Sequence, residues 1–390
     1  MAMNTAYDLS PLLTLLGLGL LVAAGPLLWV WRRNRHASPQ RRLQALTLLT
    51  LFLTFDLVLF GAFTRLSDSG LGCPDWPGCY GQASPLGARA PIAAAQAAMP
   101  TGPVTHGKAW IEMIHRYLAT GVGALILALT VLAWRAAKAQ PRGATPPVLS
   151  PWWPTFTLVW VCLQGAFGAL TVTMKLFPAI VTLHLLGGLM LLALLGGQAV
   201  RHAQAAQGRS PVAVSPGLRG LLLLATLMLA AQLALGGWVS TNYAVLACSD
   251  FPTCQGRWWP PMNFEQGFEL WRALGLTGDG APISFAALTA IHYVHRLMAV
   301  LVLGLLWLLA WRLGRLPLLR QPARWLAGLA ALQLLTGLSN VVLGWPLLAA
   351  ILHTGGAGAL VLVLTWALLA TRAGATVPAS RHPAAFGFRA

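Results

Sequence analysis

Four histidines recur in a repeated pattern. His115 and His295 are each followed by an arginine within an apolar segment, and His184 and His353 each stand near the start of a later apolar segment. The segments that lead to His184 and His353 align without gaps at a constant offset of 169 residues. Two neutral imidazoles that face each other across a helix bundle can occupy the axial positions of a haem iron. The repeat therefore predicts one histidine pair in each half, with a hydrogen bond to a neighbouring helix as the alternative for any single histidine.

Two cysteine pairs repeat as well. Cys73-Pro-Asp-Trp-Pro-Gly-Cys79 and Cys248-Ser-Asp-Phe-Pro-Thr-Cys254 each enclose a short turn that contains proline and can close as a disulfide. A zinc site is disfavoured because each loop offers two thiolates and no nearby histidine, whereas structural zinc takes four ligands. We expect Cys248–Cys254 to be a structural disulfide. We expect Cys73 and Cys79 to be paired too. The alternative for this pair is a redox-active role.

Charged residues flank the histidines differently in the two halves. Glu112 lies three residues before His115 on the same helix face, whereas the aligned residue of the second half is His292. A carboxyl group at the first site alone could take or give a proton there, and an ion pair with a nearby basic side chain is the alternative. Arg116 and Arg296 follow their histidines, where a guanidinium could bind a haem propionate or extend to the membrane interface.

The composition places these residues in a membrane. The chain of 390 residues is 57% hydrophobic and 9% charged, with a mean hydropathy of +0.68, whereas soluble domains are about 25% charged. Nine apolar segments are long enough to cross a bilayer of about 30 Å. We therefore predict an all-α integral membrane protein of two pseudo-symmetric four-helix bundles and one extra N-terminal helix. The segments are 11–31, 43–64, 110–134, 153–174, 178–200, 218–240, 285–311, 325–345 and 347–371.

The repeat also predicts how the chain divides. Each half has an even number of helices, so the two bundles should be related by an axis along the membrane normal. We expect an extra helix with a basic cytoplasmic loop, the bundle of the first site, a cytoplasmic linker, the bundle of the second site and a cytoplasmic tail. These parts are residues 1–42, 43–200, 201–216, 217–371 and 372–390.

Basic residues are concentrated on one side of the predicted segments. Short loops and the tail on that side hold 18 of the 26 Lys and Arg residues, which makes it cytoplasmic by the positive-inside rule. Topology and contact with anionic lipid explain the net charge of +17, and no nucleic-acid partner is needed. The first segment follows Asp8 and no basic residue, so we expect a retained helix with its N-terminus outside. Loops 65–108 and 241–284 then lie on the outer, oxidising side, where disulfides persist.

Several motifs together resemble the haem A synthase family. They are the run Gly61-Ala-Phe-Thr-Arg-Leu-Ser-Asp-Ser-Gly-Leu-Gly-Cys-Pro-Asp-Trp-Pro-Gly-Cys79, the run Glu112-Met-Ile-His-Arg-Tyr117, and the positions of His184 and His353. The similarity covers about residues 43–371 and leaves the first helix outside the eight-helix pattern of the family. The cysteines match the cysteine-bearing form of the family.

This resemblance implies a membrane oxidoreductase that converts the C8 methyl group of haem O to a formyl group, giving haem A for terminal oxidases. It implies that His295 and His353 hold a permanent haem b, and that His115 and His184 hold the substrate haem with Glu112 beside its reacting edge. It also implies a bacterial inner-membrane location, periplasmic cysteine loops, and haem O synthase and oxidase assembly factors as partners. The alternatives are a bis-haem b electron carrier and a membrane thiol–disulfide oxidoreductase.

Overall fold

The computed structural model describes residues 10–139 and 149–374. Within these ranges, nine helices are long and apolar enough to cross a membrane, one for each predicted segment. The prediction of an all-α, multi-pass membrane protein is therefore confirmed. The nine helices are α1 (Ser10–Arg33), α2 (Pro39–Leu66), α4 (His106–Lys138), α5 (Trp152–Thr173), α6 (Pro178–Ala206), α7 (Pro216–Thr241), α9 (Phe285–Gly314), α10 (Arg320–Val342) and α11 (Leu347–Leu369).

Some of the residues that predict the orientation lie outside the described ranges. Asp8 and most of the predicted tail 372–390 lie there, and so do three of the counted basic residues, Arg142, Arg381 and Arg389.

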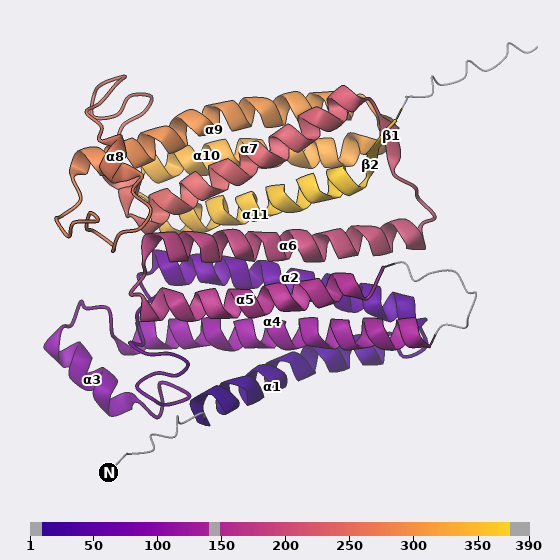
Figure 1. Ribbon diagram of the computed structural model, residues 1–390, viewed down its shortest axis with the longest axis horizontal. Coiled ribbons are helices and arrows are strands. Elements are labelled where there is room, and N and C mark those ends of the chain that lie inside the picture. The colour runs from indigo at the N-terminus through magenta and orange to yellow at the C-terminus, as the bar shows by residue number, and fades with distance from the viewer. Residues whose placement is uncertain (1–9, 140–148, 375–390) are drawn as a thin grey trace, which may run out of the picture.

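The helices form two four-helix bundles that lie side by side (Figure 1). In the first, α2 packs on α4, α4 on α5 and α5 on α6; in the second, α7, α9, α10 and α11 repeat these contacts in the same order. The bundles meet where α6 contacts α11, α6 contacts α7, and α2 contacts α11. A twofold axis between α6 and α11 exchanges the last two contacts, so the packing has the pseudo-symmetry expected from the repeat.

The connections at one end of the bundles carry both cysteine pairs. Loop 67–105 includes α3 (Arg89–Ala98), and loop 242–284 includes the 3-10 turn η1 (Ala244–Ala247) and the short helix α8 (Phe264–Gly267). Both disulfides, Cys73–Cys79 and Cys248–Cys254, are present as predicted. We call this end of the molecule, at the left of Figure 1, the disulfide end.

Helix α4 begins four residues before its predicted start because its cap lies outside the apolar run. The Thr105 hydroxyl accepts a hydrogen bond from the Lys108 backbone N–H at 3.2 Å and so caps the first turn. His106 and Lys108 are polar, so hydropathy alone leaves them out of the segment. With this start, His115 is the tenth residue of α4 and His295 the eleventh of α9. The two histidines therefore lie at nearly the same depth.

The leading helix α1 packs closely against the first bundle. Gly19 meets the Thr120 side chain of α4, and a Cβ on Gly121 would lie 2.9 Å from Val22. Small residues of this kind let two membrane helices approach. Leu15 at the disulfide end of α1 is buried in the same cluster as the Cys73–Cys79 disulfide. Helix α1 therefore packs against the first cysteine loop in addition to adding a membrane helix to the first bundle.

Two short strands occur at the opposite end, which the sequence analysis did not predict. Strand β1 (Val212–Val214) of the linker pairs in parallel with β2 (Thr371–Ala373), directly after α11. The Arg219 side chain donates to the Thr371 hydroxyl at 2.7 Å beside them. The pairing joins segments far apart in the sequence, and three-residue strands give no periodic signal. It ties the linker between the bundles to the end of the second bundle.

Candidate functional site

The structure brings the repeated histidines together in pairs. His115 of α4 lies close enough to His184 of α6 for charges on the two rings to interact. The same is true of His295 of α9 and His353 of α11. His184 and His353 are each the seventh residue of their helix. The two halves therefore present their histidine pairs at matching positions, near the disulfide end.

The first histidine of each pair packs against a glycine of a neighbouring helix. A Cβ on Gly61 of α2 would lie 3.0 Å from Nε2 of His115, and a Cβ on Gly236 of α7 would lie 3.0 Å from Cε1 of His295. Such distances are shorter than ordinary van der Waals contacts, so even alanine would press on either ring. The two glycines occupy aligned positions of α2 and α7.

The second histidine of each pair has the same arrangement. A Cβ on Gly168 of α5 would lie 3.3 Å from Cε1 of His184, and a Cβ on Gly337 of α10 would lie 3.4 Å from Cε1 of His353. All four rings are thus backed by glycine, which sequence reasoning missed. The signal was present, because these glycines recur at the offsets of the repeat. Two imidazoles per half, each given room by a glycine, fit the axial ligation of a haem iron.

Two other glycines, which recur at the offset of the repeat, have a packing role instead. The amide of Gln164 lies against Gly187, and Nε2 of Gln333 lies against Gly356, one helical turn after each second histidine. Nε2 of Gln333 also donates to the carbonyl of His353 at 2.9 Å. Helix packing therefore accounts for Gly187 and Gly356.

Polar contacts to the rings differ between the halves. In the second half, Oγ1 of Thr336 lies 2.9 Å from Nδ1 of His353, and the Gln232 amide nitrogen lies 3.1 Å from Nδ1 of His295. Nδ1 of His184, in the first half, is buried without a hydrogen-bond partner among the described residues. Both histidines of the second pair therefore have a polar side chain beside Nδ1. Among the described residues, His184 of the first pair has no such partner.

Glu112 is held by the first cysteine loop and by an arginine. The side chain is only 4% exposed. Its Oε2 accepts a hydrogen bond from the backbone N–H of Cys73 at 2.8 Å, and its Oε1 forms an ion pair with Arg116, one turn further along α4. The ion pair that the sequence left as an alternative is thus present, and it fixes the carboxylate between α4 and the disulfide turn.

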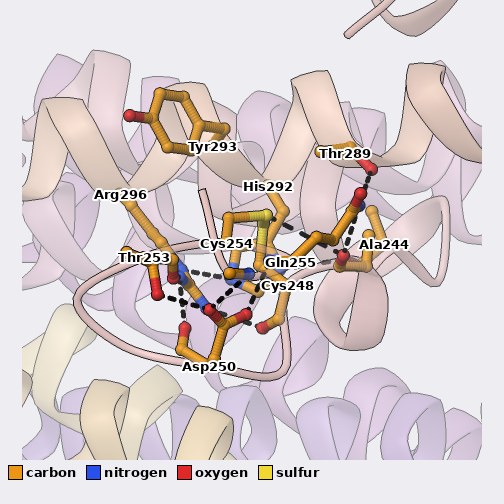
Figure 2. Close-up of a disulfide and its surroundings, with 12 residues drawn as sticks. Ala244, Cys248, Asp250, Thr253, Cys254, Gln255, Thr289, His292, Tyr293 and Arg296 are labelled. Carbon is orange, nitrogen blue, oxygen red and sulfur yellow. Dashed lines mark hydrogen bonds between the residues drawn. A yellow bond between two sulfur atoms is a disulfide. The ribbon is translucent and has the colours of Figure 1, made fainter. Parts of the chain in front are cut away.

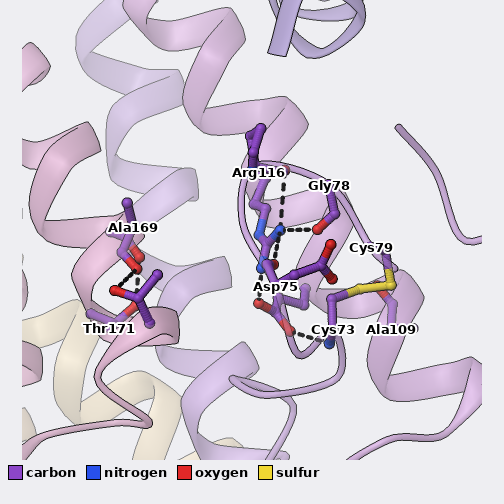
Figure 3. A network of polar contacts seen from close by, with 12 residues as sticks. Cys73, Asp75, Gly78, Cys79, Ala109, Arg116, Ala169 and Thr171 are labelled. Carbon is purple, nitrogen blue, oxygen red and sulfur yellow. Dashed lines mark hydrogen bonds and ion pairs between the residues drawn. A yellow bond between two sulfur atoms is a disulfide. The ribbon is translucent and has the colours of Figure 1, made fainter. Parts of the chain in front are cut away.

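Arg116 points into the turn closed by the Cys73–Cys79 disulfide (Figure 3). Its Nη1 donates to the carbonyls of Asp75 and Pro77 at 3.1 Å each and to the carbonyl of Gly78. The guanidinium is thus buried and bonded to the loop carbonyls. A contact with a haem propionate stays a prediction for this residue.

The second half repeats this arrangement with one substitution (Figure 2). Arg296 donates to the carbonyls of Asp250 and Thr253 at 2.8 and 3.0 Å and to that of Cys248 at 2.6 Å. His292 takes the place of Glu112 and accepts a hydrogen bond from Nε of Arg296 at 3.1 Å. Each arginine thus joins its helix to its cysteine loop, and only the acceptor beside it differs in charge.

An aspartate shapes each cysteine loop. Asp75 accepts hydrogen bonds from the backbone N–H groups of Tyr80 and Gly81 at 2.6 and 2.7 Å. Asp250 accepts equivalent bonds in the second loop. Hydrogen bonds from the Thr253 hydroxyl, which has the larger effect, and from the Gly256 N–H lower the pKa of Asp250 to about 2. In both loops, hydrogen bonds to the aspartate fix a turn whose backbone carbonyls face the arginine.

Comparisons with known proteins agree with this geometry. The sequence matches the family described as "Cytochrome oxidase assembly protein" over residues 44–365, which begins within α2. It is 39% identical over 316 residues to a "Heme A synthase" of Shewanella oneidensis, covering 81% of this chain and 92% of that protein. A "Heme A synthase" of Symbiobacterium thermophilum is 28% identical over 356 residues, covering 88% and 99%. One of Halalkalibacterium halodurans is 25% identical over 320 residues, covering 80% and 91%.

Proposed function

This chain belongs to the haem A synthase family, and we propose that it oxidises the C8 methyl group of haem O to a formyl group, giving haem A for terminal oxidases. The observation that carries this proposal is the similarity over most of the chain, joined to two histidine pairs backed by glycine in a membrane bundle. The protein is accordingly a membrane-embedded oxidoreductase with haem O as its substrate.

The two pairs take different roles in this proposal. His295 and His353, in the bundle of residues 217–371, would hold a permanent haem b, which supplies electron transfer when bound. His115 and His184, in the bundle of residues 43–200, would hold the substrate haem. The contact between Thr336 and His353 supports this division, because an oxygen that accepts the second N–H of a ligating histidine strengthens the hold of that histidine on a metal.

Glu112 is the residue we assign to proton transfer at the first site. It belongs to the same α4 turn as His115, and its carboxylate is fixed by the Cys73 N–H and by Arg116. A carboxylate held in one place can accept or return a proton without first being reoriented. His292 occupies the aligned position in the second half, where no proton transfer is required.

The arginines would help to place the haem edges. Arg116 and Arg296 hold the cysteine loops at the disulfide end. The propionates of both haems would lie at this end if they point toward the arginines. Each guanidinium carries five donors, so a propionate could share it with the loop carbonyls. Arg116 and Arg296 are therefore our candidates for propionate contact.

We assign the protein to the bacterial inner membrane, with the disulfide end on the periplasmic side. Disulfides persist in that oxidising compartment, and basic residues such as Arg32, Arg33 and Arg312 lie at the last turns of helices that end on the opposite side. Haem O is made by a separate enzyme and haem A is used by an oxidase. A haem O synthase and oxidase assembly factors are therefore the partners this location favours.

The test is conversion of haem in cells. The chain is expressed in a bacterium that makes haem O and has no haem A synthase of its own, and membrane haems are extracted and identified by mass spectrometry. We expect haem A to form with the wild-type chain and to be absent with His115→Ala. Haem O that stays unconverted by wild-type protein that is folded and loaded with haem would overturn the proposal.

A further inference from the structure

A buried threonine contacts the last histidine of the second half. Thr336 of α10 is only 6% exposed, and its Oγ1 lies 2.7 Å from the carbonyl of Leu332 and 2.9 Å from Nδ1 of His353. A hydroxyl has one hydrogen and two lone pairs. Since the Leu332 carbonyl can only accept, it takes that hydrogen. The contact with His353 is then a hydrogen bond donated by Nδ1–H of the ring to Oγ1.

This hydrogen bond decides which nitrogen of His353 can bind a metal. A proton on Nδ1 leaves the lone pair of the neutral ring on Nε2. A ligating histidine commonly donates its other N–H to an oxygen, which fixes the ring and makes it a stronger ligand. Thr336 supplies such an oxygen, and Gly337 beside it lets α10 approach the same ring.

The first half lacks this contact. Phe167 occupies the position of α5 that aligns with Thr336, and its side chain has no polar atom. Nδ1 of His184 is buried without a hydrogen-bond partner among the described residues, although the Gln164 backbone lies close enough to interact with the ring.

We propose that Thr336 is a positioning residue that makes His353 a strong, permanent haem ligand, and that Phe167 at the aligned position keeps the haem at His184 exchangeable. The inference rests on the proposed function, which requires one haem to stay and the other to arrive as substrate and leave as product. Equal ligands in both halves would trap the product. The difference between Thr336 and Phe167 makes the two haem ligands unequal in strength, although the two sites are otherwise repeated.

The test measures haem retention in Thr336→Val, which keeps the shape and removes the hydroxyl. Purified haem-loaded protein is mixed with excess apomyoglobin as a haem acceptor, and haem transfer is followed by absorbance. Loss of an outer partner of a ligand typically costs about 10- to 100-fold in metal affinity, so we expect haem b to leave about 10 to 100 times faster. The midpoint potential should also rise, by roughly 59 mV for each tenfold loss of ferric over ferrous affinity.

Two further variants separate this effect from general damage. Thr336→Ser should restore retention, because it restores the oxygen. Thr365→Val is the matched control, since the Thr365 hydroxyl also bonds a carbonyl one turn back, that of Val361 at 2.8 Å, within α11. Its haem release and potential should match those of the wild type. Wild-type release and potential in Thr336→Val, or equal changes in Thr365→Val, would overturn the proposal.

The reciprocal variant decides the matter if Thr336→Val fails to fold. Phe167→Thr adds a hydroxyl beside His184 and should slow the release of haem from the first site by about tenfold or more. Unchanged release would refute the proposal. These readouts do not depend on haem A being made, so failure of the conversion assay and failure of this inference are distinguishable.

Discussion

Replacing Glu112 with glutamine separates a catalytic role from a structural one. The carboxylate accepts from the Cys73 N–H through Oε2 and pairs with Arg116 through Oε1. Glutamine keeps one acceptor oxygen, so one of these two donors must face its NH₂ group. A buried donor without a partner costs about 1 to 3 kcal/mol. Arg116 keeps its three loop carbonyls, so the loss should stay below the roughly 3 to 5 kcal/mol of a fully broken buried pair.

The expected effect on the reaction is larger than the effect on stability. Loss of an acid–base group typically lowers the rate by about 10² to 10⁴, which corresponds to about 3 to 5 kcal/mol of activation free energy. The assay is haem A formed from haem O per molecule of haem-loaded protein, which removes any difference in yield. Haem binding should survive because Glu112 is not an iron ligand, and a hydroxymethyl haem should accumulate if the carboxyl acts in the second step.

His292→Gln is the matched control. His292 has the aligned position and accepts from Arg296 as Glu112 does from Arg116, so the variant disturbs the equivalent contact in the other half. Its conversion per loaded protein should be near that of the wild type. Wild-type conversion per loaded protein in Glu112→Gln would show that the carboxylate only holds the cysteine loop, and the catalytic assignment would then be refuted.

Two other predictions concern the second half. Gly236→Ala should weaken haem b binding, because the new methyl lies 3.0 Å from the His295 ring; an absorbance titration of the purified variant measures this, and unchanged affinity would contradict the role of the glycine. Cys248→Ser should lower stability by up to about 2 to 5 kcal/mol and reduce haem retention, whereas Cys73→Ser should mainly lower activity, since its loop holds Glu112. Thermal unfolding with a conversion assay distinguishes the two, and equal effects of both variants would contradict this division.

Much of the fold was accessible from the sequence because hydropathy and repetition are local signals. The nine spans, the two disulfides and the pairing of His115 with His184 and of His295 with His353 follow from apolar run length and from residues that recur at fixed offsets. The start of α4 was missed because it is set by the Thr105 cap, which hydropathy does not register.

Contacts between distant segments could not be predicted in this way. The loop carbonyls that bind Arg116 and Arg296 are backbone groups, which carry no sequence signature. The β1–β2 pairing depends on where the linker passes the end of α11. The glycines behind the histidines were visible as repeats, and only the structure shows that Gly61 and Gly236 face imidazole rings while Gly187 faces a glutamine.

The two histidine pairs are proposed to hold different haems, and porphyrin analysis of purified ligand variants shows which haem each pair binds. His353→Ala and His115→Ala are purified from cells that supply both haem b and haem O, and the haems in each are extracted, identified and counted. We predict that His353→Ala loses haem b while haem O remains bound, and that His115→Ala keeps haem b and loses haem O or haem A. A full complement of haem b in His353→Ala would show that His353 is not a ligand of haem b.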